Sequence, residues 1–317
     1  MARLSAGHLT ARVRCSGRDI ASIDLILDRP LRVLSGFHGK PPADCLRLLP
    51  LLFPLCGTAH VLAALQATEA AASMVPASAH AAARNTLALA DMLAAQIWRS
   101  CIDWAHLTRT PAVPGPVAQA RRLVERIALA LYPEGDWQRI GGGRLAPDGA
   151  ALAAARAELK QLRAILDLTG ALVTLRTEMV RAMAGTEPEW TAFVDGCFAD
   201  MVDATTANLE VLDAQLQAMV ELPATPVTSA LLAVEAGHGK GIVPTARGEL
   251  CYELDLDAAG VRTCCVSAPT DRVFAADGPV VTLLQRLRQA EDPLLAMRWI
   301  VAAYDPCIEV KIEQAAD

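Results

Sequence analysis

The residues best suited to chemistry are two cysteines far apart in the chain, each close to a second polar group. Cys307 follows Asp305 and Pro306, and Cys56 precedes His60 by four residues. On a helix, a step of four puts both side chains on one face. Thiolates and imidazoles are ligands for iron, nickel and zinc. The pattern therefore predicts a metal-linked site if the fold brings residues 56 and 307 together.

A purely structural role is the alternative for these residues. Cys56 would then be a small buried apolar side chain, and His60 a hydrogen-bonded core histidine. Nine cysteines is an odd number, and without a secretory context most are expected to be reduced thiols. A zinc site is disfavoured because the adjacent pair Cys264 and Cys265 lacks the spacing of zinc ligands.

Composition narrows the class of protein. The 317 residues are 53% hydrophobic and only 4% aromatic, and the net charge of −6 argues against nucleic acid or an anionic membrane as partner. The apolar stretch 48–65 contains Pro50, Pro54 and Gly57, so we expect a buried segment and not a membrane span. The N-terminus has no continuous apolar core of the signal-peptide kind, which favours a cytoplasmic protein.

Periodicity predicts a mainly α protein with small β-hairpins, an α+β fold. Alternating residues over 7–27 and 249–268 indicate two hairpins with turns at Gly17 and Gly260. Apolar residues at spacings of three and four, with capping and proline signals, predict the helices. These expected helices span 58–73, 78–107, 117–131, 150–184, 187–222, 279–290 and 293–304.

One domain over 1–317 is expected, in three parts. An N-terminal hairpin occupies 1–30, a helical bundle 42–222, and a hairpin with the C-terminal motif 245–317. For the cysteines to form one site, the first and last parts must meet at the centre of the molecule.

The terminal motif resembles that of NiFe hydrogenase large subunits, Asp-Pro-Cys-x-x-Cys-x-x-His. Asp305 and Cys307 match, whereas Val310 stands for the second cysteine and Glu313 for the histidine. Only four residues follow Glu313, so the cleavable tail of hydrogenase precursors is not expected. The resemblance implies a metal-site segment that has lost half of its ligands.

A second segment is similar to the N-terminal hydrogenase motif Arg-x-Cys-x-x-Cys-x-x-x-His. Cys56 takes the second cysteine and His60 the histidine, while Phe53 replaces the first cysteine and Leu51 the arginine. Residues 36–44 resemble the preceding family segment, where His38 stands in place of a proton-relaying glutamate.

Three further matches follow in the family's order. Asp91 falls on the aspartate above the hydrogenase site. Residues 245–250 resemble Ala-Pro-Arg-Gly-x-Leu, with Ala246 for the proline and Arg247 for the arginine over the metals. Pro269 and Thr270 resemble the Ala-Pro-Thr segment around the cyanide ligands of iron.

Together these segments are similar to a shortened large subunit with its central helical bundle. Within that group, the lost cysteines resemble the hydrogenase maturation proteins of the HupK/HoxV type. The resemblance implies a scaffold that transiently carries or assembles an Fe(CN)2(CO) group and neither holds nickel nor activates hydrogen, because Phe53 and Val310 replace two nickel ligands.

The same resemblance implies the roles of the site residues. Cys56 and Cys307 would bind the iron, although Cys307 matches a position that is terminal to nickel. Two thiolates make the unit dianionic, so burial requires a cation and hydrogen-bond donors. Arg247 and Thr270 are expected to supply these. The pocket would be completed by Ala246, Pro269, His60 and Asp305, and more weakly by Asp91 and His38.

The implied partners are a HypC-type iron chaperone, its HypD-type assembly partner and the apo hydrogenase large subunit. Such a scaffold is not an enzyme. Two alternatives stay open on the sequence. One is an iron-free interaction chaperone in which Cys56 and Cys307 are core thiols. The other is a remnant hydrogenase with weak activity, which would need nickel.

Overall fold

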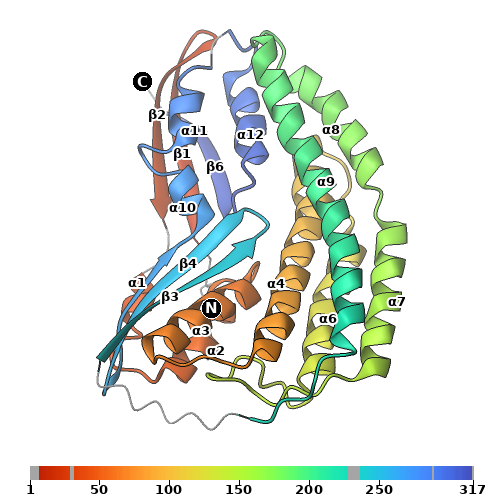
Figure 1. Ribbon diagram of the computed structural model, residues 1–317. Helices are drawn as coiled ribbons and strands as arrows, with labels where there is room; N and C mark the ends of the chain where they lie inside the picture. The colour runs from red at the N-terminus through yellow and green to blue at the C-terminus, as the bar shows by residue number, and fades with distance from the viewer. Residues whose placement is uncertain (1–6, 29–31, 228–235, 288, 316–317) are drawn as a thin grey trace.

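A computed structural model describes residues 7–28, 32–227, 236–287 and 289–315. Helices make up most of the described chain, and two three-stranded sheets lie beside them (Figure 1). The predicted α+β class with a helical bundle is therefore confirmed. In the described residues, no helix combines the length and the apolar character needed to cross a bilayer.

Four long helices form the bundle. In the packing order α7–α6–α4–α9, with α7 also packed on α9, each helix contacts two others. Buried Leu and Ala side chains from all four belong to one core cluster. The bundle helices are α4 (Ser78–Trp98), α6 (Pro114–Leu131), α7 (Gly149–Ile165) and α9 (Pro188–Met219).

Two of the predicted helices are interrupted. The helix expected over 78–107 contains a π turn at Arg99–Asp103, followed by α5 (Trp104–Thr108). The helix expected over 150–184 ends at Ile165. A new helix, α8 (Leu168–Ala182), starts there because the Asp167 carboxylate accepts a hydrogen bond from the Gly170 N–H and caps it.

The first sheet joins the two ends of the described chain. Its strand order is β2–β1–β6. β1 (His8–Ser16) and β2 (Asp19–Asp28) form the predicted antiparallel hairpin. β6 (Glu309–Gln314), which was not predicted, runs parallel to β1, with Val310 opposite Leu9. The terminal motif is therefore held against the N-terminal hairpin, directly after Cys307.

The second sheet has the order β3–β4–β5. β4 (Gly248–Asp257) and β5 (Gly260–Ser267) are the second predicted hairpin. β3 (Ala236–Thr245) is an additional strand that lies on α3 (Gly57–Ala71).

Close packing of β3 on α3 depends on three glycines. They are Gly237, Gly239 and Gly241, and a Cβ on any of them would collide with backbone atoms of α3. Glycine therefore lets the strand lie directly on the helix, and it fixes the end of β3 relative to Cys56.

Short helices complete the fold. The helix predicted over 279–290 ends earlier, at Leu284, whereas the one predicted over 293–304 is confirmed within one residue. These elements are α1 (Arg32–Ser35), α2 (Pro42–Leu52), α10 (Pro269–Val273), α11 (Pro279–Leu284) and α12 (Pro293–Ala303).

Candidate functional site

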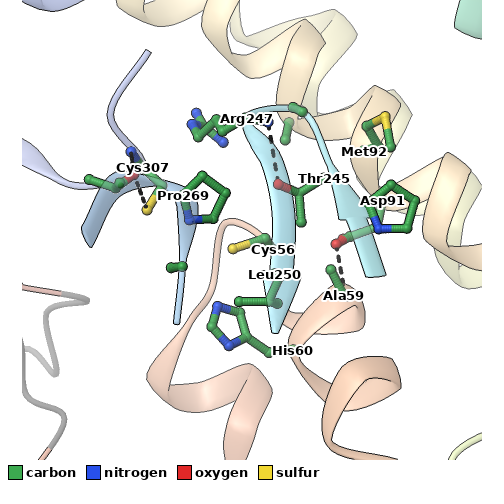
Figure 2. Close-up of a pocket in the computed structure, with 15 residues that line it drawn as sticks. Cys56, Ala59, His60, Asp91, Met92, Thr245, Arg247, Leu250, Pro269 and Cys307 are labelled. Carbon is green, nitrogen blue, oxygen red and sulfur yellow. Dashed lines mark hydrogen bonds between the residues drawn. The ribbon is translucent and has the colours of Figure 1, made fainter. Parts of the chain in front are cut away.

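A pocket lies where the start of α3, the middle of α4, the β3–β4 turn and the start of α10 meet the segment before β6 (Figure 2). The pocket is small, with a cavity volume of about 20 Å³. Its lining residues are Cys56, Ala59, His60, Asp91, Met92, Ala95, Pro244, Thr245, Ala246, Arg247, Leu250, Ala268, Pro269, Thr270 and Cys307. The fold thus gathers most of the predicted site residues in one place.

Cys56 occupies the N-cap position of α3. Its backbone carbonyl accepts the first hydrogen bond of the helix from His60 N at 3.1 Å. The next residue, Gly57, packs so closely on α2 that an added Cβ would lie 3.0 Å from the Pro50 Cα. This contact holds the start of α3 in place, and Figure 2 shows the Cys56 sulfur at the pocket.

Cys307 is held by a reciprocal pair of hydrogen bonds with Thr270. The Thr270 hydroxyl donates to the Cys307 sulfur at 3.2 Å, and the same oxygen accepts from the Cys307 N–H at 3.2 Å. Thr270 is buried in the first turn of α10. The pair of hydrogen bonds fixes the position of the sulfur relative to α10.

Arg247 links the pocket to Asp305. Its Nε donates to the Asp305 carbonyl oxygen at 2.7 Å and its Nη2 to the carboxylate at 3.2 Å. Burial lowers the pKa of Arg247, but Asp305, Cys307 and Cys56 outweigh it and raise the pKa above its ordinary value. Both sulfurs therefore lie within electrostatic reach of the guanidinium. Within the described residues, its Nη1 donates no hydrogen bond.

A second arginine, Arg99, was missed by the sequence analysis. Its Nη1 donates to the other carboxylate oxygen of Asp305 at 2.7 Å, and the Arg99 side chain is only 3% exposed. Its Nε and Nη2 have no hydrogen-bond partner in the described part of the chain. The π turn carries Arg99, in line with the frequent occurrence of such turns at functional sites.

Beside Cys56 the pocket is lined by His60, and two further rings hold His60 from behind. His60 stacks on Phe53 with ring centroids 3.8 Å apart and planes 4° apart. The His60 Nδ1 atom lies 2.8 Å from the Tyr252 hydroxyl. Phe53, which the sequence match puts at the position of the first hydrogenase cysteine, thus holds the histidine ring in one orientation.

Asp91 lies on the α4 side of the pocket. Its carboxylate accepts a hydrogen bond from Ala59 N at 3.3 Å and lies 3.7 Å from the Arg121 guanidinium. Burial raises the pKa of Asp91 to about 6, although Arg121 and the Ala59 N–H oppose the shift. This acid is therefore only weakly compensated.

Two predicted residues do not line the pocket. Asp305 lies behind it and contacts it through Arg247. His38 is exposed, and its Nδ1 lies 2.9 Å from the carbonyl oxygen of Arg262 on β5. The structure therefore does not bring His38 to the other site residues.

Comparison with known proteins identifies the family. No protein-family model matches the chain. The hydrogenase expression/formation protein HupK of Azotobacter vinelandii is 31% identical over 98% of this chain and 100% of that protein. The chain belongs to the HupK family. The hydrogenase expression/formation protein HupV of Azotobacter chroococcum mcd 1 is 30% identical over the same shares of the two chains.

Solved structures agree on the fold of this HupK-family chain. The NiFeSe hydrogenase of D. vulgaris Hildenborough in the reduced state matches 96% of this chain and 96% of its own with a TM-score of 0.73. An NAD+-reducing NiFe hydrogenase matches with a TM-score of 0.61. Sequence identity is 13% in both, so these matches establish a hydrogenase large-subunit fold only.

Proposed function

We propose that this protein is a hydrogenase maturation scaffold that holds an Fe(CN)2(CO) group between Cys56 and Cys307 and passes it to the apo large subunit. One observation carries the proposal. Two thiols that are far apart in the sequence, Cys56 and Cys307, line one pocket. Arg247 also lines this pocket, and both sulfurs raise the pKa of its buried guanidinium. The HupK family names refer to hydrogenase expression and formation, which supports a hydrogenase subunit as the client protein.

The donor set suits a metal group that brings its own ligands. In the described residues, no cluster of three or more His, Cys, Asp or Glu side chains is placed to hold a metal ion. An iron that already carries two cyanides and one carbonyl needs fewer protein donors, and soft thiolates suit it. Two sulfurs are therefore a reasonable match for this cargo.

Charge balance supports the same cargo. Fe(II) with two cyanides and two thiolates is a dianion, which is costly to bury without compensation. The pocket is backed by Arg247 and Arg99, which share one carboxylate, Asp305. The three groups together carry one net positive charge, which offsets half of the dianion's charge, and the neighbouring Asp103 also acts on Arg247. In our proposal, Arg247 Nη1 donates to a cyanide nitrogen and Thr270 supports the Cys307 thiolate.

Nickel retention is disfavoured in this proposal. The hydrogenase position of one missing ligand is filled by Phe53, whose ring stacks on His60. The other is Val310, which is part of β6 and packs on the apolar core beneath the first sheet. Neither side chain is a nickel ligand, so the iron group would be held without a second metal and remain transferable.

Infrared spectroscopy tests the proposal. Protein purified without oxygen from cells with active maturation genes is expected to show cyanide and carbonyl stretches. Cys56→Ala and Cys307→Ala are expected to abolish them. Cys197→Ala is the matched control, because Cys197 is a half-buried thiol of α9 outside the pocket, and it should leave the bands unchanged.

Other outcomes select the alternatives. Wild-type protein without these bands that still binds the apo large subunit would be an interaction chaperone without iron. Nickel bound in a one-to-one ratio would indicate a remnant hydrogenase. The HypC-type and HypD-type proteins are the proposed donors of the group, and loss of the bands in cells that lack them checks that step.

A further inference from the structure

The open edge of β6 has no partner strand within the described residues. β6 is the last strand of the order β2–β1–β6. Such an edge presents unpaired N–H and C=O groups, and proteins commonly guard it with proline, bulges or charge. β6 carries the charged residues Glu309, Lys311 and Glu313 but has neither proline nor a bulge, so its backbone groups stay available for pairing.

One hydrogen bond shows which backbone groups of β6 face outward. Ala315 N donates to Val13 O at 2.8 Å, so the Ala315 amide points to β1. Because successive residues of a strand point their amides to opposite sides, the odd-numbered residues of β6 pair with β1. The amides of Val310, Ile312 and Gln314 therefore point to the open edge.

This edge lines a long groove that leads to the candidate site. The groove contains about 1950 Å³ of empty space, part of it open to solvent. Residues 308–313 form one wall, and residues of α5 and α12 form the others. Cys307 lines both the groove and the pocket, so a chain in the groove would lie next to the iron-binding sulfur.

We propose that an extended segment of the client large subunit adds to the edge of β6 as a fourth strand and places the client beside Cys307. This inference rests on the proposed function and names the docking surface that the handover uses. Extended segments bind sheet edges in this way, with affinity from main-chain hydrogen bonds. The walls formed by α5 and α12 favour a single chain over the sheet edge of a second folded copy.

The two faces of β6 specify the side chains of that segment. Val310 and Ile312 pack on the core below the sheet, while Glu309, Lys311 and Glu313 are exposed on the other face. The bound strand should therefore alternate, with apolar residues on the core side. Basic residues opposite Glu309 and Glu313 complement their charges across the strands.

Two substitutions at Ile312 distinguish the contribution of its backbone N–H to binding from that of its side chain. Ile312→Pro removes one outward N–H and leaves the ladder to β1 intact. Ile312→Ala removes the same apolar contact and keeps the N–H. The probe is the apo large subunit of the hydrogenase from the same organism, purified from cells without the iron-assembly genes, and binding is measured by biolayer interferometry.

We expect Ile312→Pro to weaken binding by about tenfold or more and Ile312→Ala by about threefold or less. Equal binding by the two variants would overturn the proposal. If Ile312→Pro unfolds on circular dichroism, Gln314→Pro replaces it, because the Gln314 side chain is exposed and its amide also points outward.

Two controls keep the interpretations apart. A dimer of this protein in light scattering that Ile312→Pro dissociates would assign the edge to a second copy and overturn the client proposal. Infrared bands of the iron group should be the same in Ile312→Pro and wild type. Missing bands in wild type would defeat the proposed function, whatever the binding result.

Discussion

The two sides of the pocket are stabilised by different kinds of interaction. On the Cys307 side, Thr270 hydrogen-bonds to Cys307, and Asp305 joins Arg247 and Arg99 through buried ion pairs. On the Cys56 side, Phe53, His60 and Tyr252 pack as rings. One side is held mainly by electrostatic interactions, and the other by the packing of rings.

The two buried aspartates show the contrast most clearly. Asp305 receives hydrogen bonds from two arginines, at 2.7 Å from Arg99 and 3.2 Å from Arg247. Asp91, on the Cys56 side, has one arginine, Arg121, at 3.7 Å, and burial raises its pKa to about 6. Electrostatic compensation is therefore concentrated next to Cys307, where a scaffold that releases its cargo would need to adjust charge.

The largest effect is expected from Asp305→Asn. Asparagine tolerates the positive φ of 47° at this position, so the change isolates the charge. Loss of the carboxylate leaves Arg99 and Arg247 buried without their shared anion, and we expect about 3–5 kcal/mol less stability in urea unfolding. Stability equal to that of wild type would show that the Cys307 side does not depend on this ion pair.

A smaller effect with a defined pH dependence is expected at Asp91. Its pKa is raised to about 6 in the folded state, against about 3.9 in unfolded chains. The unfolded state therefore ionises first as pH rises, and stability should fall by roughly 2–3 kcal/mol between about pH 4 and 6.

Asp91→Asn should flatten that fall, because it removes the ionisation and keeps an acceptor for Ala59 N. Denaturant unfolding of both proteins at several pH values measures the difference. The comparison is needed because desolvation and Asp305 also raise the pKa of Asp103 to about 6. Parallel pH curves for variant and wild type would mean that Asp91 carries no such penalty.

The smallest effect is expected from Phe53→Leu. It keeps an apolar side chain and removes the stack on His60, so we expect a loss of about 1 kcal/mol. The loss should not change with salt concentration, unlike that of Asp305→Asn. Salt-dependent stability loss in Phe53→Leu would contradict the division into an electrostatic and an aromatic side.

Local signals predicted much of the fold. Alternation and the turns at Gly17 and Gly260 gave both hairpins, and helical periodicity gave the bundle. β3 was missed because Gly237, Gly239 and Gly241 replace the bulky residues that mark a strand. Glycine is needed at these positions because the strand lies directly on α3, and no local sequence pattern reveals that contact.

Sequence motifs predicted those pocket residues that lie within the motifs themselves. Cys56, Cys307, Arg247 and Thr270 meet as expected, because each lies in a recognisable segment. Arg99 lies in no such segment, although an arginine within a long, largely apolar predicted helix was a usable signal. β6 was missed because its partner β1 is about 300 residues away and the segment read as a metal loop.

The separation of the two cysteines also has a consequence in time. Residues 56 and 307 are about 250 positions apart, and chains are made at about 5–20 residues per second, so roughly 10–50 s pass between their syntheses. Throughout that interval the nascent protein has Phe53, Cys56 and His60 but lacks the thiol of Cys307. If Cys307 binds the cargo as proposed, binding is a late event that follows the translation of Cys307 and the pairing of β6 with β1.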